Sequence, residues 1–307
     1  MSNGLNILLP KPVVKLLGGL LLVTSVFTSS GCGIKLLYNN AERLTRWWVS
    51  DYIDMTPEQR KFLDASSAEI LYWHRTTQLA LYRDQLLLLA KEISEPMDRA
   101  ELQIYVDRVE SWGKTINARA APVALEMLLS LSAEQRRKFQ RELVKSNREY
   151  EKEAKRPAAE RSAEDARDYM SILKRFTGRL SKDQRSFVQE QHLRLEPDAQ
   201  VILDYRLNWQ QRLLLALNSE PPDVAMIDDL MVNFDAHYTE EFARMLDTNE
   251  VIYQELTLGV LNGLTSRQRT RVADKLRDYA QLCTELIADA PSRPPPAAPE
   301  LFPVPPF

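Results

Sequence analysis

The sequence predicts an all-α fold, a multi-helix bundle, on three observations. A capping-box motif, in which Ser or Thr is followed three residues later by Gln, occurs four times along the 307 residues. Between these motifs, apolar residues recur at spacings of three and four, which places them on one face of a helix. Glycine is scarce, with nine residues in the chain, and this disfavours sheets with tight turns and glycine-rich phosphate loops.

The four capping boxes predict four helix starts. In a capping box the hydroxyl accepts the N3 amide proton, and the Gln side chain returns to the N-cap amide. An Arg follows the Gln in every copy, although capping does not require it. We expect each Arg to pair with an acid on a neighbouring helix. The boxes join Thr56 with Gln59, Ser132 with Gln135, Ser181 with Gln184 and Thr265 with Gln268, and the Arg residues are Arg60, Arg136, Arg185 and Arg269.

The N-terminal residues 1–31 have the parts of a secretory signal peptide. Lys11 and Lys15 precede an apolar run over residues 16–27, and small residues follow at 28–31. The apolar run is too short for a transmembrane span. We therefore expect residues 1–31 to be removed.

Cys32 directly follows this segment and is the candidate lipidation site. Gly31 before Cys32 resembles the lipobox of bacterial lipoproteins. The resemblance implies cleavage between Gly31 and Cys32, acylation of Cys32, and a lipidated anchor over residues 32–35. Ser29 stands where that family usually has Leu, and Ser29 with Gly31 also fits ordinary signal cleavage, which would cut the same bond without attaching lipid. Gly33 stands where Asp would signal a different destination, so the resemblance implies the periplasmic side of the outer membrane of a Gram-negative bacterium.

The first predicted helix covers residues 36–52 and carries Trp47 and Trp48. Two roles are open for these tryptophans. They dock the helix on a core, which is the commoner role and the one we favour, or they sit at a membrane interface beside the anchor.

A long helix is expected next, from Thr56 towards Ile93, with Pro96 ending it. Asp98 caps the following helix, which Pro122 should break or kink. The box at Ser132 opens a helix that fades into a charged, solvated stretch over 148–168, interrupted at Pro157. Further amphipathic helices are expected over residues 169–180, from the box at Ser181, between Pro197 and Pro221, over residues 227–245, and from the box at Thr265.

Internal similarity predicts two copies of one helical unit. Thr56 and Ser181 lie 125 residues apart, and the run Leu-Leu-Leu-Ala at 87–90 matches the same letters at 213–216. We assign helical unit 1 to residues 36–155, a charged connector to 156–162, and helical unit 2 to 163–290. Residues 291–307 hold eight prolines and predict a disordered, extended tail.

Part of the chain is similar to a known family. The segments Tyr-Asn-Asn-Ala at 38–41, Trp-Trp at 47–48 and Asp-Tyr-Ile-Asp-Met-Thr-Pro-Glu-Gln at 51–59 resemble the opening of a family of uncharacterised Gram-negative lipoproteins, a domain of unknown function. Glu42 departs from that pattern, in which Asp followed by an aromatic residue is usual. The resemblance implies a location and no activity.

Candidate catalytic and metal-binding residues are not apparent. His74, His192 and His237 do not share zinc spacing, and none has a Glu three residues earlier as in di-iron bundles. Cys283 lies on an apolar helical stripe and is expected to be a small buried hydrophobe. We therefore expect no enzyme, no cofactor and no metal. The formal charge of −3 becomes −5 when residues 1–31 are removed, which gives no reason to expect nucleic acid.

These observations predict a periplasmic lipoprotein held at the membrane by its lipid, with a helical body that binds or scaffolds a protein partner in the envelope. An alternative comes from the boxes themselves, which are similar to the Leu-Thr-x-x-Gln motif of periplasmic helical chaperones and envelope-stress proteins. That function would use an open apolar surface around residues 86–90 and 213–217. A helical enzyme built from scattered acids is the third hypothesis.

Overall fold

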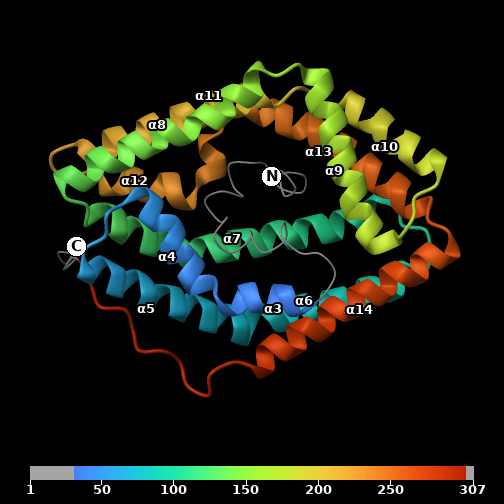
Figure 1. Ribbon diagram of the computed structural model, residues 1–307, viewed down its shortest axis with the longest axis horizontal. Coiled ribbons are helices and arrows are strands. Elements are labelled where there is room, and N and C mark those ends of the chain that lie inside the picture. Colours follow the sequence, from blue (N-terminus) through green and yellow to red (C-terminus); the bar gives the residue numbers. More distant parts are fainter. Residues whose placement is uncertain (1–30, 302–307) are drawn as a thin grey trace.

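The computed structural model describes residues 31–301, and this range contains helices and no strand (Figure 1). The predicted all-α bundle is therefore confirmed. The predicted signal peptide up to residue 30, and residues 302–307, lie outside the described residues. None of the described helices combines the length and the apolar character that crossing a bilayer requires. The elements are α3 (Gly31–Asn39), α4 (Ala41–Tyr52), α5 (Pro57–Trp73), η2 (His74–Gln78), α6 (Leu79–Glu92), α7 (Arg99–Leu129), α8 (Ala133–Lys155), α9 (Ala158–Thr177), α10 (Lys182–Arg194), α11 (Ala199–Asn218), α12 (Val224–Val232), η3 (Phe234–His237), α13 (Glu240–Asn262) and α14 (Ser266–Ala288).

All four predicted capping boxes form, at the starts of α5, α8, α10 and α14. In each box the Ser or Thr side chain accepts from the N3 backbone amide, and the N3 Gln returns to the N-cap amide. Asp98 and Glu101 form a fifth box at the start of α7. Because this chemistry is local, these starts could be read from the sequence alone.

Two predicted helices are divided in the structure. The one expected over residues 227–245 falls into α12, η3 and α13. The helix expected over 36–52 is divided at Asn40 into α3 and α4, because Asn40 lies outside the helical region with φ −109° and ψ 13°. Pro122, which was expected to break or kink its helix, does not break it, since α7 runs through that position. Pro122 and Ala118, four residues earlier, are both exposed, so water can satisfy the carbonyl that proline leaves without a donor.

The charged stretch over 148–168 is helical on both sides of Pro157, as predicted. It is less solvated than expected, because Tyr150 and Ala166 are buried. Tyr150 packs with residues of α11 and α13. The helix α9 starts at Ala158, within the stretch assigned to the connector.

Each half of the chain packs one of its helices against a helix of the other half. The helix formed by α5, η2 and α6 is continuous, and its second part, α6, packs along α14 at the other end of the chain. In the same way α11 packs along α8, so each half supplies the partner for the last helix of the other. Figure 1 shows the two pairs on opposite sides of the molecule. The duplication itself stays a prediction, and this reciprocal packing agrees with it.

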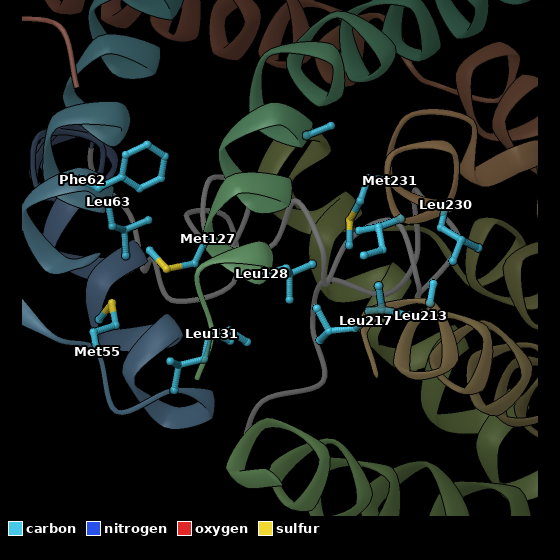
Figure 2. Close-up of a cluster of buried hydrophobic side chains, with 14 residues drawn as sticks. Met55, Phe62, Leu63, Met127, Leu128, Leu131, Leu213, Leu217, Leu230 and Met231 are labelled. Carbon is cyan, nitrogen blue, oxygen red and sulfur yellow. The ribbon is translucent and has the colours of Figure 1, made fainter. Parts of the chain in front are cut away.

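The main hydrophobic core lies between the first half of the chain and α11–α12 (Figure 2). Phe62 and Leu63 of α5 approach it from one side, and Leu217 and Leu230 approach from the other, with Leu128 of α7 between them. Burying an aliphatic side chain of this size stabilises the fold by about 2 kcal/mol. This core therefore holds the two halves together.

The segment after α14 has no helix or strand through residue 301, as expected for a proline-rich sequence. It does not extend freely into solvent, however. Ala298 and Leu301 pack against the main core, and the Leu301 amide donates to the Glu126 carboxylate on α7. Proline prevents a helix here, but it does not prevent the apolar side chains between the prolines from being buried.

Candidate functional site

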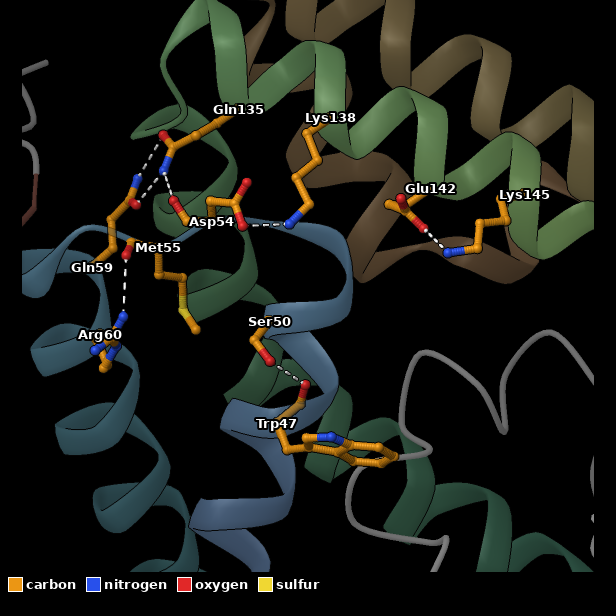
Figure 3. A network of polar contacts seen from close by, with 10 residues as sticks. All are labelled: Trp47, Ser50, Asp54, Met55, Gln59, Arg60, Gln135, Lys138, Glu142 and Lys145. Carbon is orange, nitrogen blue, oxygen red and sulfur yellow. Dashed lines mark hydrogen bonds and ion pairs between the residues drawn. The ribbon is translucent and has the colours of Figure 1, made fainter.

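The Gln side chains of the first two capping boxes meet (Figure 3). Gln135 Nε2 donates to Gln59 Oε1 at 2.7 Å, and Gln59 Nε2 donates to Gln135 Oε1 at 3.2 Å. Each amide also donates to a carbonyl just before the other helix: Gln135 to Asp54 O at 2.8 Å and Gln59 to Ser130 O at 3.2 Å. Both Gln side chains are buried, so this pair fixes α5 against α8.

The same contacts recur in the second half of the chain. Gln184 Nε2 donates to Gln268 Oε1 at 2.9 Å, and Gln268 Nε2 donates to Gln184 Oε1 at 3.1 Å. Gln184 also donates to Gly263 O, and Gln268 to Arg179 O. The two carbonyls again lie two residues before the partner's N-cap. The Gln residues of the four predicted capping boxes thus form two structural joints, by which we mean the pair Gln59 with Gln135 and the pair Gln184 with Gln268.

The predicted acid partners of the four Arg residues were wrong. Each guanidinium instead donates to backbone carbonyls that lie just before a helix start or at a helix end, where the last carbonyls of a helix lack an intrahelical partner. Three of them reach the carbonyl five residues earlier, immediately before their own box. These bonds join Arg60 to Met55, Arg136 to Leu131 and Arg185 to Leu180, while Arg269 donates to Ile93, Glu95 and, at 3.5 Å, Asn262.

Two of these Arg residues also connect the halves. Arg136, from the first half, donates to Leu217 O in the last turn of α11 at 2.6 Å. Arg269, from the second half, donates to Ile93 O at the end of α6 at 2.7 Å. A cation at a helix C-terminus is favourable because it meets the negative end of the helix dipole. The Arg in the repeated motif therefore has an architectural role that local capping did not reveal.

The three histidines lie apart in the fold. His74 is buried beside Tyr38, whose hydroxyl is 2.8 Å from His74 Nδ1, and burial lowers the pKa of His74 to about 4. His192 is buried in α10 with Nδ1 2.8 Å from Val188 O, and burial lowers its pKa as well. His237 Nε2 lies 2.9 Å from Asp229 Oδ2. No group of three or more His, Cys, Asp or Glu that could hold a metal occurs within residues 31–301.

Cys283 is partly buried and packs against the cluster around Tyr38 and Leu286, close to the predicted role of a small hydrophobe. Burial raises the pKa of its thiol to about 11. A thiol with this pKa stays protonated at neutral pH and is a poor nucleophile.

The tryptophans after the candidate anchor take different positions. Trp48 is partly buried, and its ring contacts Tyr52 one turn further along α4. Trp47 is 63% exposed, which contradicts docking on a core for this residue. Figure 3 shows its indole on the side of α4 away from α5. Leu36 of α3 is exposed to a similar extent. The backbone of Cys32 lies in the first turn of α3.

A cavity of about 340 Å³ lies between α4, α5, α7, α8, α11 and α12. Its lining is mostly apolar and rich in aromatic rings, including Trp48, Phe139 and Trp209. Ala124 of α7 also contributes to the wall. The volume falls in the range of small-molecule sites, which are apolar pockets with a few polar groups. Sequence reasoning missed this cavity because its wall draws on helices from both halves of the chain.

Two charged side chains line the cavity, Glu42 of α4 and Arg206 of α11. Burial and then the nearby Asp64 carboxylate raise the pKa of Glu42. Arg206 Nε donates to Asn147 Oδ1 at 2.7 Å, and the buried amides of Asn147 and Gln210 lie 2.8 Å apart. The lining contains no His or Cys.

The leucine-rich runs over residues 86–90 and 213–217, where a chaperone-like function would use an open apolar surface, are packed in part. Ala90 is buried against α14 residues, and Leu213 and Leu217 belong to the main core. Leu87 and Leu215 remain exposed, at 40% and 66%.

The model of a family of unknown function, DUF6279, matches residues 51–243. The predicted membership of an uncharacterised family is confirmed to this extent. No curated protein and no solved structure matches the chain.

Proposed function

We propose that this chain, which belongs to the family of unknown function DUF6279, is a lipid-anchored binding module of the cell envelope. Its ligand enters the cavity between α4, α7, α8 and α11. The observation that carries this proposal is the apolar cavity itself. The cavity is partly open to solvent, and an apolar surface of this kind that is lined by several helices marks a binding site more often than ordinary protein surface does. A cavity of this size therefore indicates a ligand site more readily than a packing defect.

Filling the cavity should abolish binding of an apolar probe. In Ala124→Phe the new ring occupies space between α7 and the facing helices, so affinity for the neutral dye N-phenyl-1-naphthylamine should fall at least about tenfold. The wild-type protein should bind the dye with a stoichiometry of one, measured by dye fluorescence and by energy transfer from Trp48 and Trp209.

Ala118→Phe is the matched control, because Ala118 is an exposed residue of the same helix and does not line the cavity. It should bind the dye as the wild type does. Circular dichroism and urea unfolding establish that both variants are folded. Equal binding by Ala124→Phe and the wild type, with both folded, would refute the cavity as the ligand site.

The anchor proposal rests on the signal-like N-terminus, on Cys32, and on the exposed Trp47 and Leu36 that follow within fifteen residues. Aromatic and apolar side chains at this distance from an acyl group can lie in the bilayer interface.

Cys32→Ser should remove acylation and release the protein from membranes. We expect incorporation of an alkyne-labelled palmitate into the wild type and none into Cys32→Ser, with the variant moving from the membrane to the soluble fraction. Cys283→Ser is the matched control and should keep both label and membrane association. A labelled Cys32→Ser protein, or an unlabelled wild type with a free N-terminal residue, would contradict the anchor.

A further inference from the structure

Arg206 stands out in the wall of the cavity because, among the described residues, its guanidinium is held by neutral groups. Nε donates to the side-chain oxygen of Asn147 at 2.7 Å, and Nη2 donates to the Ser146 hydroxyl at 2.9 Å. The guanidinium lies 4.6 Å from the ring centre of Tyr150. These contacts fix the side chain and leave its positive charge unneutralised.

No ion pair joins Arg206 to a carboxylate within residues 31–301, although other Arg residues, such as Arg244 with Glu196, form such pairs at 2.9 Å. Arg206 is partly buried and borders an apolar wall, so its charge is less hydrated than at an open surface. A cation in such surroundings is stabilised by an anion that brings its charge into contact.

The cavity volume restricts the apolar part of a ligand. About 340 Å³ is near the lower end of the range for ligand pockets, and it suits one hydrocarbon chain better than the two chains of a phospholipid. The aromatic and aliphatic lining offers such a chain van der Waals contacts along its length.

From these observations we infer that the ligand is a single-chain anionic amphiphile, with its chain in the apolar cavity and its carboxylate or phosphate on the Arg206 guanidinium. This inference rests on the proposed function and adds the class of ligand. Nε and one Nη2 hydrogen are donated to Asn147 and Ser146, so the head accepts from Nη1 and the second Nη2 hydrogen, which form the other donor pair of the planar fork. Asn147 and Ser146 position the fork and take no part in neutralising the head.

The test compares ligands that share a chain and differ in the head. Cis-parinaric acid serves as the fluorescent probe, and palmitate, lysophosphatidate with a palmitoyl chain, and neutral hexadecanol displace it below their critical micelle concentrations. The wild type should bind palmitate or lysophosphatidate about 10- to 100-fold more tightly than hexadecanol. The better of the two acids identifies a carboxylate or a phosphate head.

Arg206→Gln should lose this preference and keep the wild-type affinity for hexadecanol, which also shows that the cavity is intact. Arg206→Lys keeps the charge without the fork and should retain a smaller preference. Arg212→Gln, on the same helix and outside the cavity lining, is the matched control and should leave the preference unchanged.

Equal binding of palmitate and hexadecanol by the wild type, or an unchanged preference in Arg206→Gln, would overturn the inference. If all three ligands bind and Ala124→Phe blocks them, the proposed function stands even when the head makes no difference. If none binds, or if Ala124→Phe binds all of them as the wild type does, the proposed function itself fails.

Discussion

Replacing Gln135 with Ala should lower the free energy of unfolding by about 3 kcal/mol. The change removes the hydrogen bond that the Ser132 amide donates to Gln135 Oε1, 2.9 Å in length. In the wild type, Gln135 Nε2 also donates to the Asp54 carbonyl and to the Gln59 side-chain oxygen. Both acceptors lose this donor in the variant. A buried polar group without a partner costs about 1–3 kcal/mol, so the loss exceeds that of a helix cap alone.

Urea unfolding followed by circular dichroism measures this change, and the chain offers two comparisons. Gln140→Ala lies on the exposed face of the same helix and should shift stability by no more than about 0.5 kcal/mol. Gln268→Ala removes the equivalent bonds to the Thr265 amide, Arg179 O and Gln184, so its effect should resemble that of Gln135→Ala. A loss below 1 kcal/mol in Gln135→Ala would show that the pair adds little beyond ordinary capping.

A double-mutant cycle separates the Gln–Gln contact from the caps. Gln59→Ala and Gln135→Ala each remove one cap, while only their coupling reports the reciprocal amide bonds. We expect the double variant to be more stable than the sum of the single losses predicts, because it leaves no unpaired amide behind. Additive losses would mean that the two Gln side chains act independently.

The helix starts could be predicted because their signals are local. A Ser or Thr and a Gln three residues apart satisfy each other within one turn, so the start of α8 needs no information from elsewhere in the fold. The partners across the joints could not be predicted in this way. Gln59 meets Gln135 only after α5 and α8 have packed, and one sequence contains no sign of which boxes meet.

The Arg residues illustrate a different limit. An Arg in a repeated motif suggests an ion pair, since acids are abundant in this chain. The structure uses helix-end carbonyls instead, and Arg136 reaches one from α11 in the other half. The Arg residues indicated a hydrogen-bond donor, but their acceptors are backbone carbonyls. Every residue has such a carbonyl, so the sequence does not indicate which one accepts.

The cavity was the feature that was hardest to predict from the sequence. Trp48, Ala124 and Trp209 belong to helical stripes that predict only burial. Whether the helices that carry them pack without a space depends on the volumes of side chains that come from both halves of the chain. Arg206 was also missed, because a single Arg on a helix reads as solvent-facing. Its position among neutral partners is visible only in the folded chain.

Acidification should destabilise the protein through His74. Its pKa is about 4 in the folded protein, against 6.5 as the ordinary value, because burial and then the neighbouring Arg75 charge disfavour the protonated ring. The unfolded chain therefore binds more protons than the folded chain between these two values. Stability is fully present above pH 6.5, falls as the pH drops towards 4, and levels off below, a loss of about 3 kcal/mol from this one residue.

His74→Gln isolates this contribution, because Gln can still accept the Tyr38 hydroxyl proton and does not titrate. Carboxylates also titrate in this range, so the quantity to compare is the difference in unfolding free energy between wild type and variant from pH 7 to pH 4. That difference should move by about 3 kcal/mol in favour of the variant as the pH falls. Burial lowers the pKa of His192 too, so repeating the pair in a His192→Gln background removes the other buried imidazole. If the difference between wild type and variant stays constant with pH, His74 takes up its proton equally well in the folded and the unfolded chain. That result would contradict a lowered pKa of His74 in the folded protein.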